Sequence, residues 1–256
     1  MLEESKFEIQ NLKVEGMGRR ILNSINLCLD GNTISGLVGK SGSGKSTIFK
    51  FCFGQLDEMQ RFQSSGKVLW KGKELSHWKL PKVIPIFQDP FGGFSPYGTM
   101  ESHLFEPFKI RKAVLGSKFF ETKEGEYERI HSYLDFFELK DHLLKRNRKE
   151  LSGGQLQRFS ILRAILCNPE YILLDEPVTA VDVIVQKKIS DLLLRLNNDQ
   201  KIGMLVISHD LGFLKYICES LSVLDEGEIV EEGKTDEVYA DPKSNLLREL
   251  KQARIL

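Results

Sequence analysis

Short apolar runs recur along the chain and are separated by longer segments of mixed polarity. They lie at residues 34–38, 83–87, 171–174, 204–207 and 221–224. Apolar runs of this length are typical of strands buried on both faces of a parallel sheet, although length and context must distinguish them from buried helices. Helical patterns lie between the runs, and their alternation with strands predicts an α/β fold whose ligands bind at the carboxyl ends of the strands.

The helical pattern at 184–196 is the clearest of these. One partly buried face is predicted there to carry Ile184, Lys188, Leu192 and Leu196. Residues 47–53 and 156–166 are also predicted to be helical.

The two ends of the chain differ from its middle. Residues 7–38 alternate apolar stretches with Gly and Asn turns, which predicts strands. Residues 89–160 have almost no strand pattern; 125–146 is predicted to be helical, and 111–125 is the best loop candidate. Internal repeats and low-complexity linkers are absent from the sequence. We therefore predict one domain, 1–256, with a core formed by 1–88 and 161–256 and an inserted helical subdomain at 89–160.

A glycine-rich loop follows the first buried run. Residues 39–47 read Gly-Lys-Ser-Gly-Ser-Gly-Lys-Ser-Thr and fit the P-loop pattern G-x-x-x-x-G-K-[ST]. Glycines let backbone N–H groups turn towards phosphate oxygens, and the following helix adds its positive N-terminus. Lys45 would reach the β- and γ-phosphates, while the Ser46 hydroxyl would ligate Mg²⁺. The predicted nucleotide-binding positions are Gly39, Ser41, Gly42, Gly44, Lys45, Ser46 and Thr47.

Two adjacent carboxylates follow the buried run at 171–174. Successive side chains of a strand point to opposite faces, so Asp175 and Glu176 can have separate roles. Asp175 would hold Mg²⁺, directly or through water. Glu176 would accept a proton from, or orient, the water that attacks the γ-phosphate. Two acids after a strand are usually a solvated turn, but the upstream P-loop favours the catalytic interpretation.

The segment Leu151-Ser152-Gly153-Gly154-Gln155 precedes a predicted helix. Ser152 is a candidate N-cap, and the exposed N–H groups of such a helix start form an anion site. One monomer cannot easily place this site and the P-loop on a single triphosphate. On local grounds alone this segment is therefore better interpreted as an ordinary Ser-capped helix.

Together these motifs resemble those of ATP-binding cassette (ABC) ATPases in order and spacing, from about residue 7 to 242. The resemblance implies a P-loop NTPase (RecA-like) core with an N-terminal antiparallel β region and an inserted helical subdomain, with ATP and Mg²⁺ as cofactors. In that family two cassettes pair head to tail, which gives Ser152 and Gly154 a partner's phosphate to bind.

Three further positions take their roles from the resemblance alone. Gln88 matches the Q-loop glutamine, which approaches Mg²⁺ and the attacking water and couples to the membrane partner. Asp182 matches the D-loop aspartate, in a Thr-Ala-Val-Asp sequence where the family more often has Ser-Ala-Leu-Asp. His209 matches the switch histidine that contacts the γ-phosphate.

One position departs from the family pattern. The family usually stacks adenine on an aromatic about 29 residues before the P-loop lysine, and residues 15–19 here read Glu-Gly-Met-Gly-Arg. Met17 or Arg19 would have to cover the base instead, since both side chains pack on aromatic faces. We expect modest ATP affinity and poor base selectivity, because a lost stacking contact costs about 1–3 kcal/mol.

The sequence after Gln88, Asp-Pro-Phe-Gly-Gly-Phe-Ser-Pro, resembles the oligopeptide, dipeptide and nickel importer ATPases, as do residues 182–186, 209–212 and 228–233. The branch implies two integral-membrane permeases, a second and different cassette, and an extracytoplasmic substrate-binding protein. The chain would lie peripherally on the cytoplasmic side of the cell membrane and power import of peptides, nickel or a metal chelate.

Composition limits the alternatives. Lys+Arg and Asp+Glu both total 36, so the formal charge is zero and we expect no nucleic-acid partner. Signal-peptide features and an apolar stretch of about 18 residues are absent from the sequence. Four cysteines without C-x-x-C spacing predict reduced, mostly buried thiols in a cytosolic protein: Cys28, Cys52, Cys167 and Cys218.

Two other functions remain open. A soluble accessory ATPase, like the one that serves carbon–phosphorus lyase, resembles the same branch. A mechanical ATPase acting on DNA or ribosomes is disfavoured by the neutral charge and by the absence of a coiled-coil insertion or a second cassette from the sequence.

Overall fold

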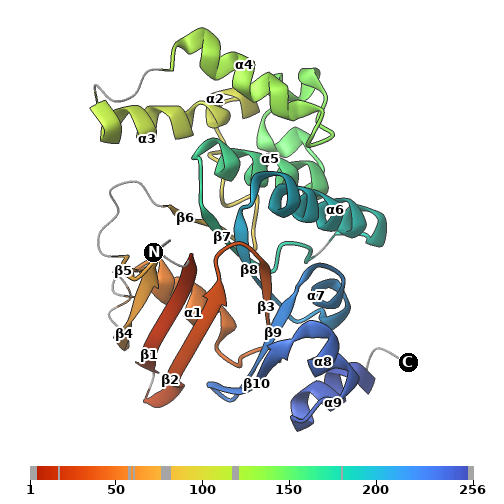
Figure 1. Cartoon of the computed structure of the whole chain (residues 1–256). Helices are drawn as coiled ribbons and strands as arrows, with labels where there is room; N and C mark the ends of the chain where they lie inside the picture. Colours follow the sequence, from red (N-terminus) through yellow and green to blue (C-terminus); the bar gives the residue numbers. More distant parts are fainter. Residues whose placement is uncertain are drawn as a thin grey trace.

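Two β-sheets stacked on one another form the lower part of the molecule, and helices extend from one side of them (Figure 1). The structure is a computed structural model, and it describes residues 5–16, 18–56, 59, 61–75, 82–116, 121–179 and 181–252.

The central sheet has the strand order β10-β9-β3-β8-β7-β6, and only its edge strand β10 is antiparallel to its neighbour. Its strands are β3 (Ile34–Val38), β6 (Val83–Ile86), β7 (Tyr171–Asp175), β8 (Gly203–Ser208), β9 (Ser220–Asp225) and β10 (Glu228–Lys234). Every residue of β3, β7 and β8 is buried, which confirms the prediction of strands covered on both faces.

Two hydrophobic clusters cover the two faces of this sheet. In β7, Ile172 and Leu174 belong to the cluster shared with the helices, whereas Tyr171 and Leu173 belong to the cluster shared with the second sheet. This alternation follows from the period of two along a strand. The central sheet therefore contributes apolar side chains to both clusters, and its carboxyl edge is held from both sides.

The second sheet is antiparallel, with the order β2-β1-β4-β5. Its strands are β1 (Lys6–Gly16), β2 (Arg19–Asp30), β4 (Phe62–Trp70) and β5 (Lys73–Glu74). Phe7 of β1 stacks on Tyr171 of the central sheet with ring centroids 5.0 Å apart. The antiparallel N-terminal region expected from the family resemblance is thus present.

The helices divide into two groups around the central sheet. Helices α2–α5, with two 3₁₀ turns, lie above the sheets in Figure 1 with α6 beside α5, and α1 and α7–α9 lie at the level of the strands. Their bounds are α1 (Lys45–Cys52), α2 (Met100–Leu104), α3 (Glu106–Leu115), α4 (Lys123–Leu134), η2 (Asp141–Lys145), η3 (Arg148–Glu150), α5 (Gly153–Leu166), α6 (Val183–Gln200), α7 (Leu211–Ile217), α8 (Thr235–Ala240) and α9 (Asn245–Gln252). None of the helices within the described ranges is long and apolar enough to cross a membrane.

The helical predictions were wrong in two places. The helix expected at 125–146 ends at Leu134, because Glu138 takes a left-handed backbone with φ of 51°. The loop expected at 111–125 is still helical up to Leu115, and residues 117–120 lie outside the described residues. The predicted subdomain boundary between 160 and 161 falls within α5, and the subdivision itself stays a prediction.

The buried face of α6 also differs from the expected one. Ile184 is 73% exposed and Lys188 is exposed as well, whereas Ile189 and Leu193 are buried beside the expected Leu192 and Leu196. Of the cysteines, Cys52 and Cys218 are buried, but Cys28 is exposed.

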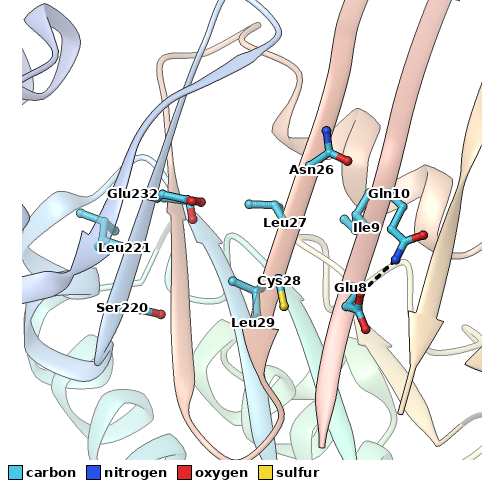
Figure 2. A pocket seen from close by; sticks show the side chains of 12 residues that line it. Glu8, Ile9, Gln10, Asn26, Leu27, Cys28, Leu29, Ser220, Leu221 and Glu232 are labelled. Atoms are coloured by element: carbon cyan, nitrogen blue, oxygen red, sulfur yellow. Dashed lines mark hydrogen bonds between the residues drawn. The ribbon is translucent and has the colours of Figure 1, made fainter. Parts of the chain in front are cut away.

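A groove of about 570 Å³ separates the two sheets at one end (Figure 2). Leu27 and Cys28 of β2 line it on one side, and Ser220 and Leu221 of β9 line it on the other. Ser220 begins β9, and Ser35, its partner in the parallel ladder, lies near the start of β3. The groove therefore lies at the amino ends of the strands, away from the loop that follows β3.

Glu170 joins the two sheets. Its carboxylate accepts hydrogen bonds from Trp70 Nε1 at 2.9 Å, Lys71 Nζ at 2.9 Å and Lys82 Nζ at 2.7 Å. Partial burial acts to raise the pKa of Glu170, but the bonds from Lys82, Lys71 and Trp70 outweigh it and lower the pKa to about 2.

Glu170→Gln should reduce the free energy of unfolding at pH 7 by about 1–2 kcal/mol, a figure discounted for solvent screening of a side chain that is one third exposed. The folded pKa is depressed, so this stabilisation is present above the ordinary value of 4.5 and is lost as the pH falls towards about 2. Urea unfolding at pH 7 and pH 3 measures this contribution, and Glu74→Gln, which changes an exposed carboxylate, is the control. Equal stability of Glu170→Gln and the parent at pH 7 would contradict the prediction.

Candidate nucleotide-binding site

The P-loop connects β3 to α1 and folds around its own lysine. Lys45 Nζ donates hydrogen bonds to the carbonyl oxygens of Gly39, at 2.7 Å, and Lys40, at 2.9 Å. Gly44, at φ of 110°, caps α1 with a backbone that side chains rarely adopt. A Cβ on Gly39 would lie 2.4 Å from the carbonyl oxygen of Leu224. Glycine is therefore required at both ends of the loop.

The Lys45 ammonium is almost fully removed from water. Its residue is 7% exposed, and this burial lowers the pKa of Lys45, while the carboxylates of Glu176 and Asp175 oppose the change. A buried cation that is held only by carbonyl oxygens and two nearby carboxylates is suited to accept an anionic ligand.

Asp175 ends β7 beside the start of α1. Its carboxylate hydrogen-bonds with the Ser46 side chain, and its Oδ1 atom is buried without a hydrogen-bond partner within the described residues. Burial raises the pKa of Asp175, and the Ser46 bond opposes this rise. An unsatisfied buried carboxylate oxygen next to a hydroxyl is an oxygen donor set that suits Mg²⁺, so the residues present fit this ion.

Glu176 lies in a different environment from Asp175, and it follows β7 instead of belonging to the strand. Its backbone φ is 50°, and its side chain is only 9% exposed. His209 donates to Oε1 from its backbone nitrogen, at 3.1 Å, and its Nδ1 lies 2.8 Å from the same oxygen. Thr179 and Ser208 donate their hydroxyls to Oε2, at 3.0 and 3.3 Å. These donors fix the orientation of the carboxylate.

His209 and Gln88 follow β8 and β6, the two strands on either side of β7, at the same edge of the sheet. His209 comes directly after β8, and its ring is 61% exposed. Since a carboxylate only accepts, the contact with Glu176 places the proton of a neutral His209 ring on Nδ1. Gln88 is exposed two residues beyond β6, whose Ile86 pairs with Leu174 of β7. The edge thus assembles the P-loop, both acids, Gln88 and His209.

The Leu151–Gln155 segment lies apart from this edge. Ser152 caps α5 and forms a reciprocal capping box with Gln155. A Cβ on Gly154 would lie 2.5 Å from Cγ1 of Val185 in α6, the helix that Asp182 caps. The described contacts of Ser152, Gly154 and Asp182 do not reach the P-loop, and α5 and α1 lie in different parts of the molecule (Figure 1).

Sequence reasoning missed the groups that hold the site residues. Thr179 hydrogen-bonds with Glu176 from the turn after β7 and Ser208 from the end of β8, and only the adjacency of Ser208 to His209 could have indicated one of them. Lys40, within the P-loop, pairs with Glu249 of α9, and this contact raises the pKa of Lys40. Of the two candidates for covering a base, Met17 lies outside the described residues and Arg19 is exposed.

A P-loop between β3 and α1, with a magnesium-suited carboxylate at the end of β7 on the far side of β8, defines a P-loop nucleotide-binding protein. A family model described as ABC transporter matches residues 22–179, more than half of the sequence. The chain therefore belongs to the ABC transporter family.

Individual relatives agree with this assignment. An oligopeptide transport ATP-binding protein, OppF of Lactococcus lactis, is 35% identical over 221 residues, which are 84% of this chain and 65% of that protein. The chain thus spans slightly less than two thirds of that relative's length. The resemblance to the peptide importer branch is confirmed.

Solved structures show the same fold. The protein cbiO1 from Clostridium perfringens, described as part of the ABC transporter complex cbiONQ, matches with a TM-score of 0.76 at 22% identity, over 98% of this chain and 97% of that one. The dimeric ATP-binding cassette MJ0796, in a post-hydrolysis state bound to ADP and Pi, matches with a TM-score of 0.70 at 25% identity, over 90% and 98%.

Gly154→Ala tests the close packing of α5 on α6. We expect a loss of about 1–3 kcal/mol in the free energy of unfolding, because the new methyl group overlaps a stiff β-branched side chain. Removing the overlap in a Gly154→Ala/Val185→Ala double variant should make the alanine at 154 neutral or stabilising, as helix propensity favours it over glycine. Urea unfolding of the parent, the Gly154→Ala and Val185→Ala single variants and the double variant gives the coupling energy between the two positions. Strictly additive effects on the free energy of unfolding would contradict the described contact.

Proposed function

We propose that this chain is the ATP-binding and ATP-hydrolysing subunit of an ABC importer. The observation that carries the proposal is the grouping of Lys45, the Ser46–Asp175 pair and Glu176 at one edge of the sheet. One buried cation, one carboxylate suited to a metal ion and one carboxylate held by several donors are the parts that triphosphate hydrolysis needs.

In this proposal the P-loop backbone and Lys45 bind the phosphates of ATP. Ser46 and Asp175 would hold Mg²⁺, with Gln88 nearby, and the ion would neutralise charge on the β- and γ-phosphates. Lys45 would exchange its two loop carbonyls for phosphate oxygens, which are stronger partners for a buried ammonium.

Glu176 would orient the attacking water and accept its proton, since its carboxylate is fixed and faces the same edge as the P-loop lysine. His209 would contact the γ-phosphate. Its ring is exposed, and its Nδ1 is taken by Glu176, so its Nε2 is the atom left for a phosphate oxygen.

Ser152, Gly154 and Asp182 would act in a pair of cassettes. Their separation from the P-loop of the same chain supports a head-to-tail arrangement, in which the capped start of α5 meets the nucleotide bound by a partner. The dimeric state of the related MJ0796 cassette also supports it. We propose a second, different cassette as the partner, as the importer branch implies.

The relatives named as oligopeptide transport proteins support peptides as the cargo. Nickel and metal chelates remain predictions from the sequence motifs. Such an importer needs two permeases and an extracytoplasmic substrate-binding protein, and it would place this chain on the cytoplasmic side of the membrane.

Glu176→Gln should slow ATP hydrolysis by about 10²–10⁴-fold while ATP binding is retained, because an amide cannot accept the water's proton. Phosphate release and equilibrium nucleotide binding measure the two effects separately. Glu232→Gln, an exposed carboxylate on β10, is the control. Near-normal turnover in Glu176→Gln would remove Glu176 from the role of general base.

Lys45→Ala should weaken ATP binding itself, by about 10- to 100-fold, since it removes a charged hydrogen-bond donor from a buried site. Isothermal titration calorimetry with ATP measures the loss, and Lys67→Ala, which changes an exposed lysine of β4, is the control. Unchanged affinity in Lys45→Ala would contradict the proposed phosphate site.

The partners are tested by purifying the tagged chain from its own cells in mild detergent and identifying the proteins that co-purify. Two multi-span permeases with a second cassette support the importer, and their binding protein would identify the cargo. A soluble enzyme complex without membrane proteins would overturn the importer and favour the accessory ATPase.

A further inference from the structure

An aromatic ring lies where a side chain at position 16 would be. Gly16 ends β1 and pairs directly with Phe62, the first residue of β4. A Cβ on Gly16 would lie 2.4 Å from Cδ1 and 2.8 Å from Cε1 of the Phe62 ring. The ring therefore covers the backbone of Gly16, and only glycine allows it that position.

This ring is on the face of the antiparallel sheet that meets the P-loop. Gly16 and Val14 are both buried, and residues two apart on a strand share a face. Val14 pairs with Leu22 of β2. A Cβ on Gly44 of the P-loop would lie 2.5 Å from Cδ2 of this same Leu22. Position 16, which the Phe62 ring covers, thus lies one same-face position, roughly 7 Å, along β1 from Val14, and Val14 is the partner of the Leu22 that reaches the P-loop.

The ring has surface to offer a ligand. Phe62 packs against the hydrophobic cluster but is only partly buried, unlike Phe7 and Phe49, which are 0% and 1% exposed. Phe7 stacks on Tyr171 and Phe49 packs on Phe53, whereas no ring contact of Phe62 is found among the described residues. A partly exposed aromatic face beside a phosphate-binding loop is a stacking platform for a nucleobase.

We propose that Phe62 stacks on the base of the bound nucleotide, so that the aromatic side chain comes from β4 instead of from β1. This assignment rests on the proposed ATP binding. The expectation of modest ATP affinity assumed that no ring was available, and with Phe62 in place the stacking contribution is retained. Base selectivity remains low, because every base presents a π-face to the ring.

Arg19 is the competing candidate. It pairs with Gly16 from β2, on the opposite side from Phe62, and its side chain is exposed. A guanidinium also stacks on a base. The two candidates differ in their response to substitution, because Phe62→Ala removes the ring alone and Arg19→Ala the guanidinium alone.

The experiment measures the affinities for ATP, GTP and inorganic tripolyphosphate by calorimetry on the full chain. Phe62→Ala should weaken ATP and GTP by a similar factor, about 5- to 100-fold, and leave tripolyphosphate unchanged. Phe62→Tyr should bind as the parent does. Phe62→Leu, which keeps an apolar side chain in the cluster, should lose base affinity without a large loss of stability.

Two further variants act as controls. Phe51→Ala removes another partly buried ring of the same cluster, in the last turn of α1, and should lower the melting temperature without changing ATP affinity. Gly16→Phe/Phe62→Ala moves the ring back to β1, into the space that Phe62 vacates, and should restore most of the lost affinity.

ATP affinity equal to that of the parent in both Phe62→Ala and Phe62→Leu would overturn the assignment. So would an equal loss for tripolyphosphate, a loss in Arg19→Ala in place of Phe62→Ala, or a relocated ring that binds no better than Phe62→Ala. If the parent chain binds neither ATP nor tripolyphosphate, the proposed function itself is contradicted. This outcome differs from those that contradict only the assignment of Phe62.

Discussion

The buried ammonium of Lys45 is the charge on which the arrangement of the site depends. A desolvated cation is costly unless oppositely charged or polar groups surround it, and two loop carbonyls and the carboxylates of Asp175 and Glu176 fulfil this requirement. These groups meet only because β3 and β7, both adjacent to β8, run parallel and end at the same edge. The register of three buried strands therefore sets the electrostatics of the site.

That register is held by packing on both faces of the sheet. The cluster shared with the second sheet contains Tyr171 and Leu173, and the cluster shared with the helices contains Ile172 and Leu174. A slip of one residue in β7 would exchange the two sets and move Asp175 away from Ser46. The hydrophobic pattern that reveals these strands in the sequence is the same pattern that aligns the acids with the P-loop.

Local motifs were predictable from sequence, and contacts through space were not. The P-loop, Asp175 and Glu176 follow directly from buried runs, so their placement could be inferred. The helix expected at 125–146 ends early, before the left-handed Glu138, which contacts other segments of the chain: Arg158 donates to its carbonyl at 3.1 Å and Lys188 to its carboxylate at 2.7 Å. The pairing of Gly16 with Phe62 was equally invisible, since it depends on the register between two strands that 46 sequence positions separate.

The segment after Gln88 is attached to the helical region more firmly than to the sheet edge from which it emerges. Arg163 of α5 lies over the Phe94 ring, with its guanidinium carbon 4.4 Å from the ring centroid. Arg148, just before the Leu151–Gln155 segment, donates to the carbonyl oxygens of Phe91 and Phe94. Any displacement of α5 relative to the sheet would pull on residues 91–94 while β6 stays in its ladder, and the strain would fall on Gln88 and its neighbours. If the proposed function holds, Gln88 would be the point where movement of the helical region meets the nucleotide site.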